Sequence, residues 1–277
     1  MEKPSRTNGL DTLRAIAIAL VFMYHYRVFV SDEPTFGFAS VLGWVGVDLF
    51  FVLSGYLIAN QVFSGVARGH QLSPKLFYIR RGLRTLPAFW FVLALYFLFP
   101  AVMGGQPPPP LWRFLTFTQN LGLHGGTAFS HAWSLCIEEQ FYLVLPLPVV
   151  AGAGMATFAS RAWVLVAMAF ALLVLAALSP GSWLNRLRVP GAYHLALWSY
   201  SIYLSHKAIA HVLHTQLVRW VLPPGIEPVV ITLACLPGGW FLYRLIEKPF
   251  MACRDRLFPG SFTTPVARQA EAGVNGS

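Results

Sequence analysis

The stretches Gly46–Ile58, GVDLFFVLSGYLI, and His131–Leu143, HAWSLCIEEQFYL, decide how this chain folds. Both are apolar enough for lipid, yet each carries carboxylates: Asp48 in the first, Glu138 and Glu139 in the second. An ionisable side chain at membrane depth costs about 2.5–3.5 kcal/mol even on a lenient insertion scale, so it marks a functional site by default. The two stretches therefore predict a membrane enzyme or transporter with acidic groups in its interior.

Composition extends this prediction to the whole chain. Of 277 residues, 56% are hydrophobic and only 11% are charged, whereas soluble domains carry about 25% charged residues. Apolar runs of the roughly 20 residues that a spanning helix needs recur along most of the sequence. We therefore predict an all-α, polytopic transmembrane helical bundle of about 6–8 spans.

The basic residues indicate topology rather than nucleic-acid binding. The formal net charge is +9, but lysine and arginine cluster beside the hydrophobic runs, where they set orientation. The acidic loop 31–34 and the loop 104–130, which carries only Arg113, are expected outside. The N-terminus and the Arg68–Arg84 stretch are expected in the cytoplasm. We predict one transmembrane domain over residues 1–258 and a disordered cytoplasmic tail over 259–277.

The number of crossings presents a difficulty. The spans are expected near residues 13–30, 41–59, 86–103, 133–153, 162–178, 195–222 and 228–246. An odd number of spans leaves the two termini on opposite sides, whereas the positive charges place both in the cytoplasm. Either the segment at 162–178 is re-entrant, or one boundary is wrong, or the chain has lost helices.

Arg14 and His25 lie on one face of the first hydrophobic helix, eleven positions apart. Eleven residues make about three turns, which separates the side chains by roughly 16 Å along the axis. Asp11 precedes Arg14 by three positions and can pair with it. A cation is thus expected at the cytoplasmic mouth and an imidazole at mid-depth, where histidine can act as general base or acyl acceptor. The alternative is a histidine that only packs between helices.

A cluster of arginines lies in the sequence FYIRRGLR, from Phe77 to Arg84, ahead of a long apolar run. Arg80 and Arg84 share a helix face at i and i+4, and Arg81 lies on an adjacent face. Arginine binds phosphate through bidentate donors, so the cluster suits a phosphorylated ligand at a cytoplasmic helix entrance. Positive-inside topology alone would also place arginines here.

A second polar cluster is expected at the external end of the fourth span. His131, Ser134 and Glu138 fall within two turns there, whereas Glu139 points about 100° away. A carboxylate in this place can orient a histidine, bind sugar hydroxyls or relay protons, or it can form a structural bridge to an arginine. Further along, residues 199–206 add hydroxyl groups and another histidine to one helix. No carboxylate accompanies the later histidines at metal-ligand spacing, so no metal is expected.

Several of these stretches occur in the same order in a known family. It is the acyltransferase 3 family of bacterial membrane O-acyltransferases, whose motifs resemble LDTLRAIAIALVFMYH, GWVGVDLFFVLSGYLI, FYIRRGLRTLPAFW, HAWSLCIEEQFYLVLP, WSYSIYLSHKAI and LIEKPF. The resemblance covers Leu10–Leu147 and about Ala196–Phe250. It implies transfer of an acyl group, usually acetyl, from cytoplasmic acyl-CoA to a hydroxyl of a cell-surface or lipid-linked carbohydrate. It also implies residence in the bacterial inner membrane, with acyl-CoA, a glycan acceptor and membrane lipid as partners.

The resemblance assigns roles to the residues singled out above. Four match catalytic positions: His25, Asp48, Glu138 and Glu139. Four match positions expected near the CoA phosphates: Arg14, Arg80, Arg81 and Arg84. Under this hypothesis five external residues meet the acceptor: His131, Trp133, Ser134, Tyr203 and His206. His25 would deprotonate the acceptor hydroxyl or carry the acyl group, helped by Asp48 or Glu138.

The chain departs from the family pattern in one region. Members of the family resemble ten-helix bundles, and several of their helices are expected between about residues 150 and 191. In this chain that region contains one apolar segment, Trp163–Leu178. Deletion of an odd number of helices would explain the parity of the spans. Two alternatives stay open. One is a transporter of small organic acids or acylated products, whose path the same charges would line; the other is an inactive, internally deleted homologue.

Overall fold

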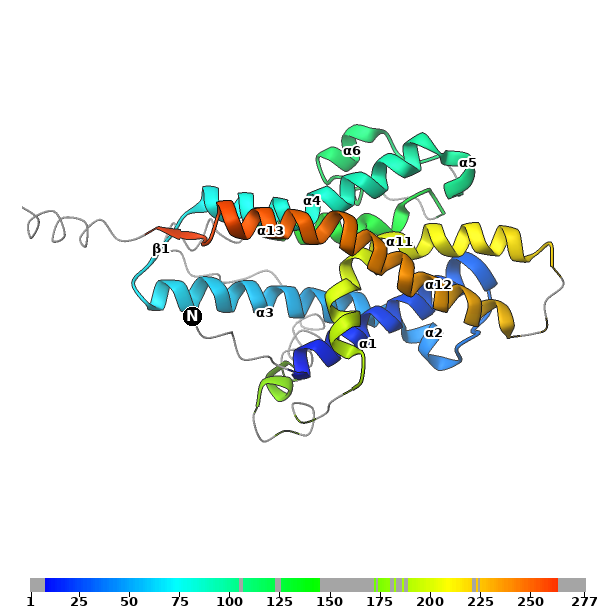
Figure 1. Ribbon diagram of the computed structural model, residues 1–277, viewed down its shortest axis with the longest axis horizontal. Coiled ribbons are helices and arrows are strands. Elements are labelled where there is room, and N and C mark those ends of the chain that lie inside the picture. Colours follow the sequence, from blue (N-terminus) through cyan, green and yellow to red (C-terminus); the bar gives the residue numbers. More distant parts are fainter. Residues whose placement is uncertain are drawn as a thin grey trace, which may run out of the picture.

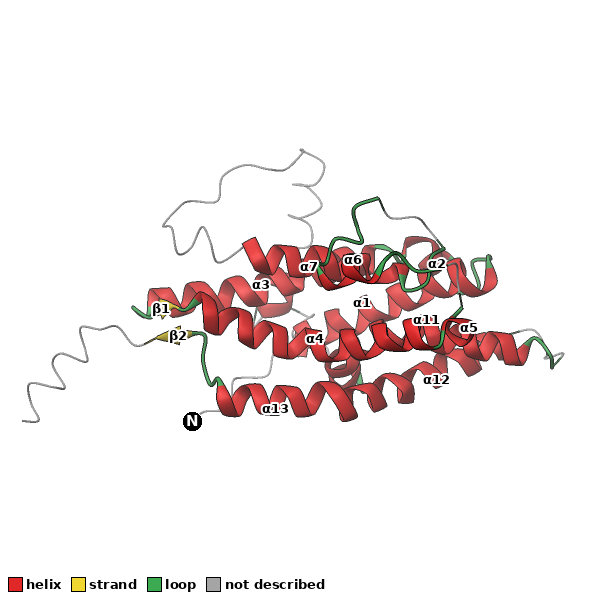
Figure 2. Cartoon of the chain, turned by 90° about the horizontal axis from the view of Figure 1, so that it is seen from above, coloured by secondary structure: helices red, strands yellow, loops and turns green. Residues whose placement is uncertain are grey.

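A computed structural model describes residues 8–104, 107–122, 126–144, 174–179, 189–220 and 225–263, with the single residues 172, 182, 186 and 223. Long α-helices dominate these ranges and run roughly along the longest axis of the molecule (Figures 1 and 2). At one end, the two-residue strands β1 (Gln71–Leu72) and β2 (Phe262–Thr263) pair antiparallel. The prediction of an all-α helical membrane protein is confirmed.

The helices fall into two groups along the chain. The first group comprises α1 (Asn8–Tyr26), α2 (Phe38–Leu42), α3 (Val45–Ala67), α4 (Pro74–Leu98), α5 (Pro100–Met103), α6 (Leu111–Leu115) and α7 (Trp133–Val144). The second comprises α11 (Ala192–Leu217), α12 (Ile226–Leu242) and α13 (Lys248–Leu257). A π-helical turn at Arg27–Ser31 extends α1, a second at Tyr243–Glu247 joins α12 to α13, and a 3-10 turn at Ser130–Ala132 leads into α7.

Three helical stretches within the described ranges are long and apolar enough to cross a membrane: Asn8–Ser31, Val45–Ala67 and Ile226–Leu257. They overlap the spans expected near 13–30, 41–59 and 228–246, although the last continues through the π-helical turn to Leu257. The spans expected near 86–103 and 195–222 are occupied by α4 and α11, helices of 25 and 26 residues. Most of the segment expected at 162–178, the C-terminal part of the span at 133–153 and residues 264–277 of the tail lie outside the described residues.

The start of α4 follows from its capping residues. The Ser73 hydroxyl accepts a hydrogen bond from the Leu76 N–H, and Pro74 occupies the first turn, where its missing N–H is not needed. The helix then continues past the internal Pro87. Because α4 begins well before residue 86, the predicted arginine cluster lies inside a helix that extends into the bundle.

Helix α1 packs against α3 and α11, and α11 also packs against α12. Glycine allows the close approach of α3 to α1. A Cβ at Gly46 would lie 2.5 Å from the carbonyl oxygen of Ala17 and 2.9 Å from Val21 Cγ2. Small residues at helix contacts let backbones approach closely in membranes, where van der Waals packing drives association.

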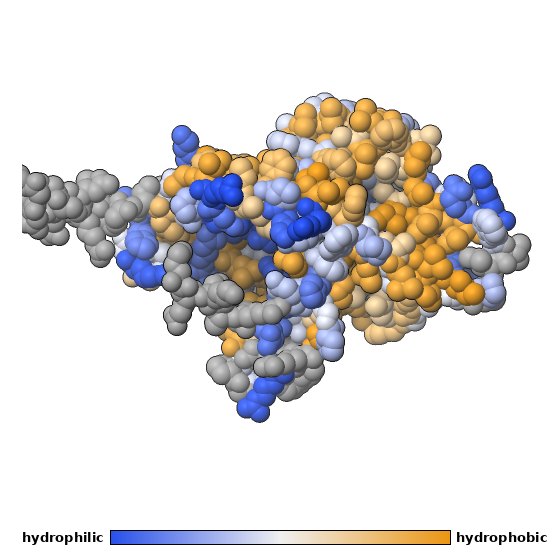
Figure 3. All heavy atoms as spheres, in the orientation of Figure 1, coloured by the Kyte–Doolittle hydropathy of each residue, from blue (hydrophilic) through white to orange (hydrophobic). Residues whose placement is uncertain are grey.

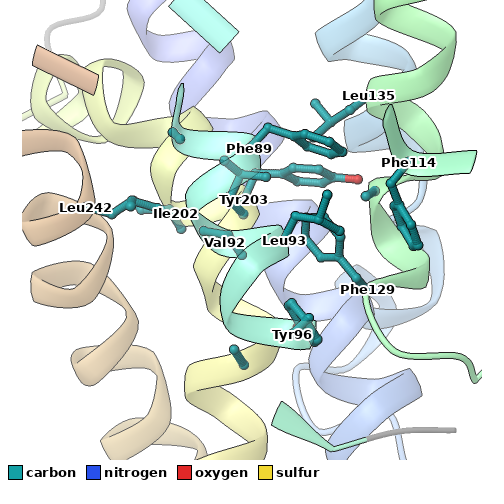
Figure 4. Close-up of a cluster of buried hydrophobic side chains, with 14 of the residues drawn as sticks. Phe89, Val92, Leu93, Tyr96, Phe114, Phe129, Leu135, Ile202, Tyr203 and Leu242 are labelled. Atoms are coloured by element: carbon teal, nitrogen blue, oxygen red, sulfur yellow. The ribbon is translucent and has the colours of Figure 1, made fainter. Parts of the chain in front are cut away.

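The largest buried cluster joins residues of α1, α3, α4, α7 and α11 with the segment before α7. Aromatic rings dominate it: Phe129 lies 4.8 Å from Tyr96 and 5.5 Å from Phe89, centroid to centroid. Figure 4 shows Tyr203 of α11 in the same cluster, among side chains of α4 and α7. The cluster therefore fixes the positions of α4, α7 and α11 around the polar site described below.

The outer surface is divided by polarity. Figure 3 shows hydrophobic residues over a broad area around α5, α6 and α12, with hydrophilic residues gathered toward α13 and at the tip beyond α11 and α12. Large exposed side chains include Trp90, Leu98, Leu233 and Phe241. An apolar belt between two polar ends is the surface that a bilayer requires.

Candidate active site

Polar side chains from five helices, α1, α3, α4, α7 and α11, line a cavity in the bundle. Its narrow part has a volume of about 80 Å³ and adjoins a wider part of about 300 Å³. Both parts share the same five residues, contributed by α1, α3, α4 and α7: Arg14, Ser54, Arg84, Glu138 and Tyr142. We call this two-part space the arginine cavity.

Glu138 is fixed on one wall of the arginine cavity by two hydroxyl groups. Ser54 Oγ of α3 donates to its Oε1 at 2.9 Å, and the Tyr142 hydroxyl donates to the same oxygen. Arg14 and Arg84 line the same space. A carboxylate thus faces two guanidinium groups, so part of the cationic charge is compensated inside the bundle.

Of the four arginines predicted to bind phosphates, three line the wide part of the arginine cavity: Arg14, Arg81 and Arg84. Arg81 donates to Gln61 Oε1 at 3.3 Å and lies over the Tyr142 ring at 5.2 Å. Arg80 does not line the arginine cavity. It pairs with Asp255 of α13 at 3.3 Å and donates to the carbonyl oxygen of Phe258. The structure therefore separates Arg80 from the other three.

The two glutamates predicted as catalytic face different spaces. Glu139 lines a second cavity of about 310 Å³ between α4 and α7, whereas Glu138 lines the arginine cavity. Arg81 and Tyr142 border both. Adjacent helix positions differ by about 100°, so this divergence is the one that the sequence spacing predicts.

Three histidines from distant parts of the chain meet in a buried cluster, His25 of α1, His131 before α7 and His206 of α11. His25 Nδ1 lies 2.7 Å from His206 Nε2, and the two rings stack at 4.9 Å. The His131 ring centroid lies 5.9 Å from that of His25 and 5.3 Å from that of His206. Neither nitrogen of His131 has a hydrogen-bond partner among the residues that the structure describes. We call these residues the histidine cluster.

Tyr203 borders both the arginine cavity and the histidine cluster. It lines the narrow part of the cavity, and its ring lies 6.3 Å from that of His25 and 5.6 Å from that of His131. Its hydroxyl donates to the carbonyl oxygen of His131, so Ser134 Oγ, 2.6 Å away, is the donor of the second bond. His25 does not line the cavity. Tyr203 and Ser134 therefore stand where the two regions meet.

Two residues predicted for the site, Asp48 and Trp133, do not line the arginine cavity. Asp48 is half-buried and lines neither part of the arginine cavity. The ring nitrogen of His25 contacts His206, and assistance to His25 from Asp48 or Glu138 stays a prediction. Trp133 is partly buried and packs against the large apolar cluster. The contact between His25 and His206 results from the packing of α11 on α1.

Lys207 is a buried cation that sequence reasoning missed. Its Nζ donates to the Thr127 carbonyl oxygen at 3.2 Å and to Ser130 Oγ at 3.1 Å, and it lies 4.0 Å from the centroid of the Phe29 ring. Its side chain thereby ties α11 to the segment that supplies His131. Its position directly after His206 in an apolar helix is a signal that could have found it.

Glu247 is a second missed residue. It ends the π-helical turn before α13, is 4% exposed and accepts a 2.7 Å hydrogen bond from Ser201 Oγ. Such π-helical turns inside α-helices occur frequently at functional sites. The acid inside the LIEKPF stretch was the signal in the sequence that could have identified it.

Within the described ranges, no group of three or more His, Cys, Asp or Glu side chains is arranged to hold a metal ion.

Comparison with known proteins bears on what this site does. A family model described as an acyltransferase domain matches residues 7–198. The chain is 34% identical over 155 residues to the peptidoglycan O-acetyltransferase OatA of Listeria monocytogenes, covering 50% of this chain and 23% of the relative. It is 31% identical over 163 residues to the O-acetyltransferase OatA of Staphylococcus aureus, covering 54% and 26%. It is also 34% identical over 161 residues to the putative peptidoglycan O-acetyltransferase YrhL of Bacillus subtilis, covering 52% and 24%.

The chain spans about a quarter of the length of the curated relatives it matches. No solved structure matches it. The family match, however, covers well over half of the chain and includes α1, α3, α4 and α7, which line the arginine cavity. The chain belongs to the acyltransferase 3 family.

Proposed function

We propose that this protein is a membrane O-acetyltransferase that moves an acetyl group from cytoplasmic acetyl-CoA to a hydroxyl of a cell-wall glycan. Family membership supports acyl transfer, and the names of the three relatives support a glycan acceptor. The observation that carries the donor is the arginine cavity, into which Arg14, Arg81 and Arg84 converge from two helices. The proposed location is the bacterial inner membrane, with the N-terminus in the cytoplasm.

The shape of the arginine cavity suits an acyl-CoA. Guanidinium groups bind phosphates through paired donors, so the wide part would hold phosphate groups of the CoA. The narrow part is lined by Val47, Phe50 and Phe51 as well as by polar groups. A space of about 80 Å³ suits a group as small as acetyl.

The histidine cluster would supply the proton transfer. In the direct route, a nitrogen of His25 takes the proton of the acceptor hydroxyl while the oxygen attacks the thioester carbonyl carbon. The carbon–sulfur bond then breaks, and CoA leaves as a thiolate that takes the proton back from His25. In the alternative route, a nitrogen of His25 attacks the thioester carbonyl carbon, the carbon–sulfur bond breaks, and CoA leaves as the thiol with the proton of the ring. The acceptor hydroxyl then attacks the acetyl-imidazole, and its proton returns to the ring. In either route, the thioester meets His25 at Tyr203 and Ser134, which border both regions.

The acceptor would approach the histidine cluster from the side opposite the arginines. Ser134 and Tyr203 offer hydroxyl groups there, and His131 offers ring nitrogens without a partner among the described residues. Polar groups that lack a partner in the free protein are available to bind sugar hydroxyls. The proposal therefore places the donor and the acceptor on two sides of Tyr203.

Release of the CoA thiol from acetyl-CoA tests this proposal. The protein is purified into nanodiscs and assayed with and without a peptidoglycan-derived oligosaccharide, as wild type and as His25→Ala. We expect release that rises with the oligosaccharide and is lost in the variant, while the variant remains folded. A folded wild-type protein that neither binds nor cleaves acetyl-CoA would contradict the proposal and favour a transporter or an inactive homologue.

A further inference from the structure

The contact between His25 and His206 defines which nitrogen of each ring carries a proton. His206 Nδ1 lies 2.8 Å from the carbonyl oxygen of Tyr203 and 3.1 Å from that of Ile202, one turn earlier in α11. A carbonyl oxygen can only accept a hydrogen bond, so Nδ1 of His206 carries the proton. In a neutral ring the other nitrogen, Nε2, is then an acceptor.

His25 must therefore be the donor in the bond between the two rings. Its Nδ1 lies 2.7 Å from the acceptor Nε2 of His206, and two lone pairs cannot share so short a contact. The proton of His25 consequently sits on Nδ1, and its Nε2 holds the free lone pair. A backbone carbonyl thus determines the tautomer of a histidine on another helix through one intervening ring.

The surroundings of the pair favour neutral rings. Both are buried, at 7% and 2% exposure, and their neighbours include the rings of Phe22, Phe29 and Tyr203. The titratable groups nearby are His131, the Tyr24 and Tyr203 phenols, the Cys235 thiol and the Lys207 amine, and Lys207 is the one cation among them. No carboxylate among the described residues contacts either ring. A proton added to the pair would be a buried positive charge without compensation.

We infer that His206 is a positioning residue that holds His25 in the tautomer with Nδ1 protonated and Nε2 free. The catalytic meaning of this inference rests on the proposed function, in which Nε2 of His25 is the atom that takes the proton. His206 would then have the task that an acidic residue performs in other base-assisted transfers, where the partner of the base fixes its tautomer and its orientation. It would do so without adding charge to a membrane interior.

Nitrogen NMR of the protein in nanodiscs, labelled with ¹⁵N-histidine, tests the inference without relying on activity. The His25 signals are identified by their loss in His25→Asn. We expect a protonated Nδ1 and an unprotonated Nε2 in the wild type. In His206→Phe the acceptor is removed, and we expect the proton of His25 to move to Nε2. His194→Phe, an exposed change on the same helix, is the matched control and should leave the His25 signals unchanged.

Kinetics on the same preparations separate positioning from packing. We expect His206→Phe to lower kcat at least about 100-fold, the lower limit of what a general base contributes, with little change in KM for acetyl-CoA. His206→Gln keeps an acceptor oxygen and should recover part of kcat. It also keeps the test decidable if His206→Phe does not fold.

Two results would overturn the inference: a wild-type His25 protonated on Nε2, or a His25 tautomer that is unchanged in a folded His206→Phe protein. Failure of the proposed function would look different. The NMR pattern would be as expected, but the wild-type protein would transfer no acetyl group.

Discussion

Ser54 of α3 and Glu138 of α7, eighty-four residues apart, are joined by a 2.9 Å hydrogen bond across the arginine cavity. The bond contributes to the association of the two helices and holds the carboxylate toward the arginines. We expect Ser54→Ala to lower the free energy of unfolding by about 1 kcal/mol, because a partly buried carboxylate loses one of its two donors. Thermal unfolding in nanodiscs measures the change.

The matched control for this prediction is Ser64→Ala on the same helix. Ser64 donates only to Asn60 within its own helix, at an exposed position. We expect its replacement to change stability by less than about 0.5 kcal/mol. Equal effects of the two variants would show that the bond between Ser54 and Glu138 does not hold α3 to α7.

The separation of the arginines predicts different kinetic effects. Arg84→Gln and Arg81→Gln each remove a cation from the arginine cavity, so we expect KM for acetyl-CoA to rise at least about tenfold, equivalent to ~1.4 kcal/mol of binding. Arg80→Gln removes an ion pair with Asp255 outside the cavity. We expect it to affect stability more than KM. Measurements of KM and of thermal unfolding for the three variants test whether Arg81 and Arg84, but not Arg80, bind acetyl-CoA. A rise in KM for Arg80→Gln as large as that for Arg84→Gln would contradict the separation.

Two glycines of α3 give a sharp test of helix packing. At Gly46 an added Cβ meets the backbone of α1 at 2.5 Å, whereas at Gly55 nothing lies within 4 Å. We expect Gly46→Ala to destabilise the protein by about 1–3 kcal/mol through overpacking. Gly55→Ala should be neutral or stabilising by about 0.5–1 kcal/mol, since alanine is the better helix former. Equal unfolding temperatures for both variants would argue against the close contact of α1 and α3.

Much of the local chemistry could be predicted because it depends on helix period alone. The divergence of Glu138 and Glu139 into different cavities follows from 100° per residue. The transmembrane stretches at Asn8–Ser31 and Val45–Ala67 follow from their apolar composition. The divergence of the glutamates and the apolar character of the spans each depend on residues within a single helix, so they could be predicted without knowing how the helices pack.

The pairings between helices could not be predicted. His25 and His206 are separated by 181 residues, and Arg80 and Asp255 by 175. Each pairing depends on how two helices pack, and a periodic apolar pattern specifies a face but not the partner of that face. This is why sequence reasoning neither paired His25 with His206 nor separated Arg80 from the other three arginines.

Lys207 provides a test of how the histidine cluster is supported. Lys207→Met retains the length of the side chain but loses the hydrogen bonds to Thr127 and Ser130. We expect faster hydrogen exchange of the backbone amides in residues 126–132, because the segment loses one of its attachments to α11 and keeps the bond from the Tyr203 hydroxyl to the His131 carbonyl oxygen. Lys75→Met, at an exposed position of α4, is the control and should not change exchange there. Unchanged exchange in Lys207→Met would show that other contacts hold this segment.

We propose that an acetyl group passes from a donor on the arginine side to an acceptor on the histidine side. Proteoliposomes test it most directly when the arginine ends face outward, an oligosaccharide acceptor is enclosed and acetyl-labelled acetyl-CoA is added outside. We expect labelled oligosaccharide inside the vesicles with wild-type protein and none with His25→Ala. Label that reaches the oligosaccharide only when both substrates are on the same side, or equally well with His25→Ala, would contradict it.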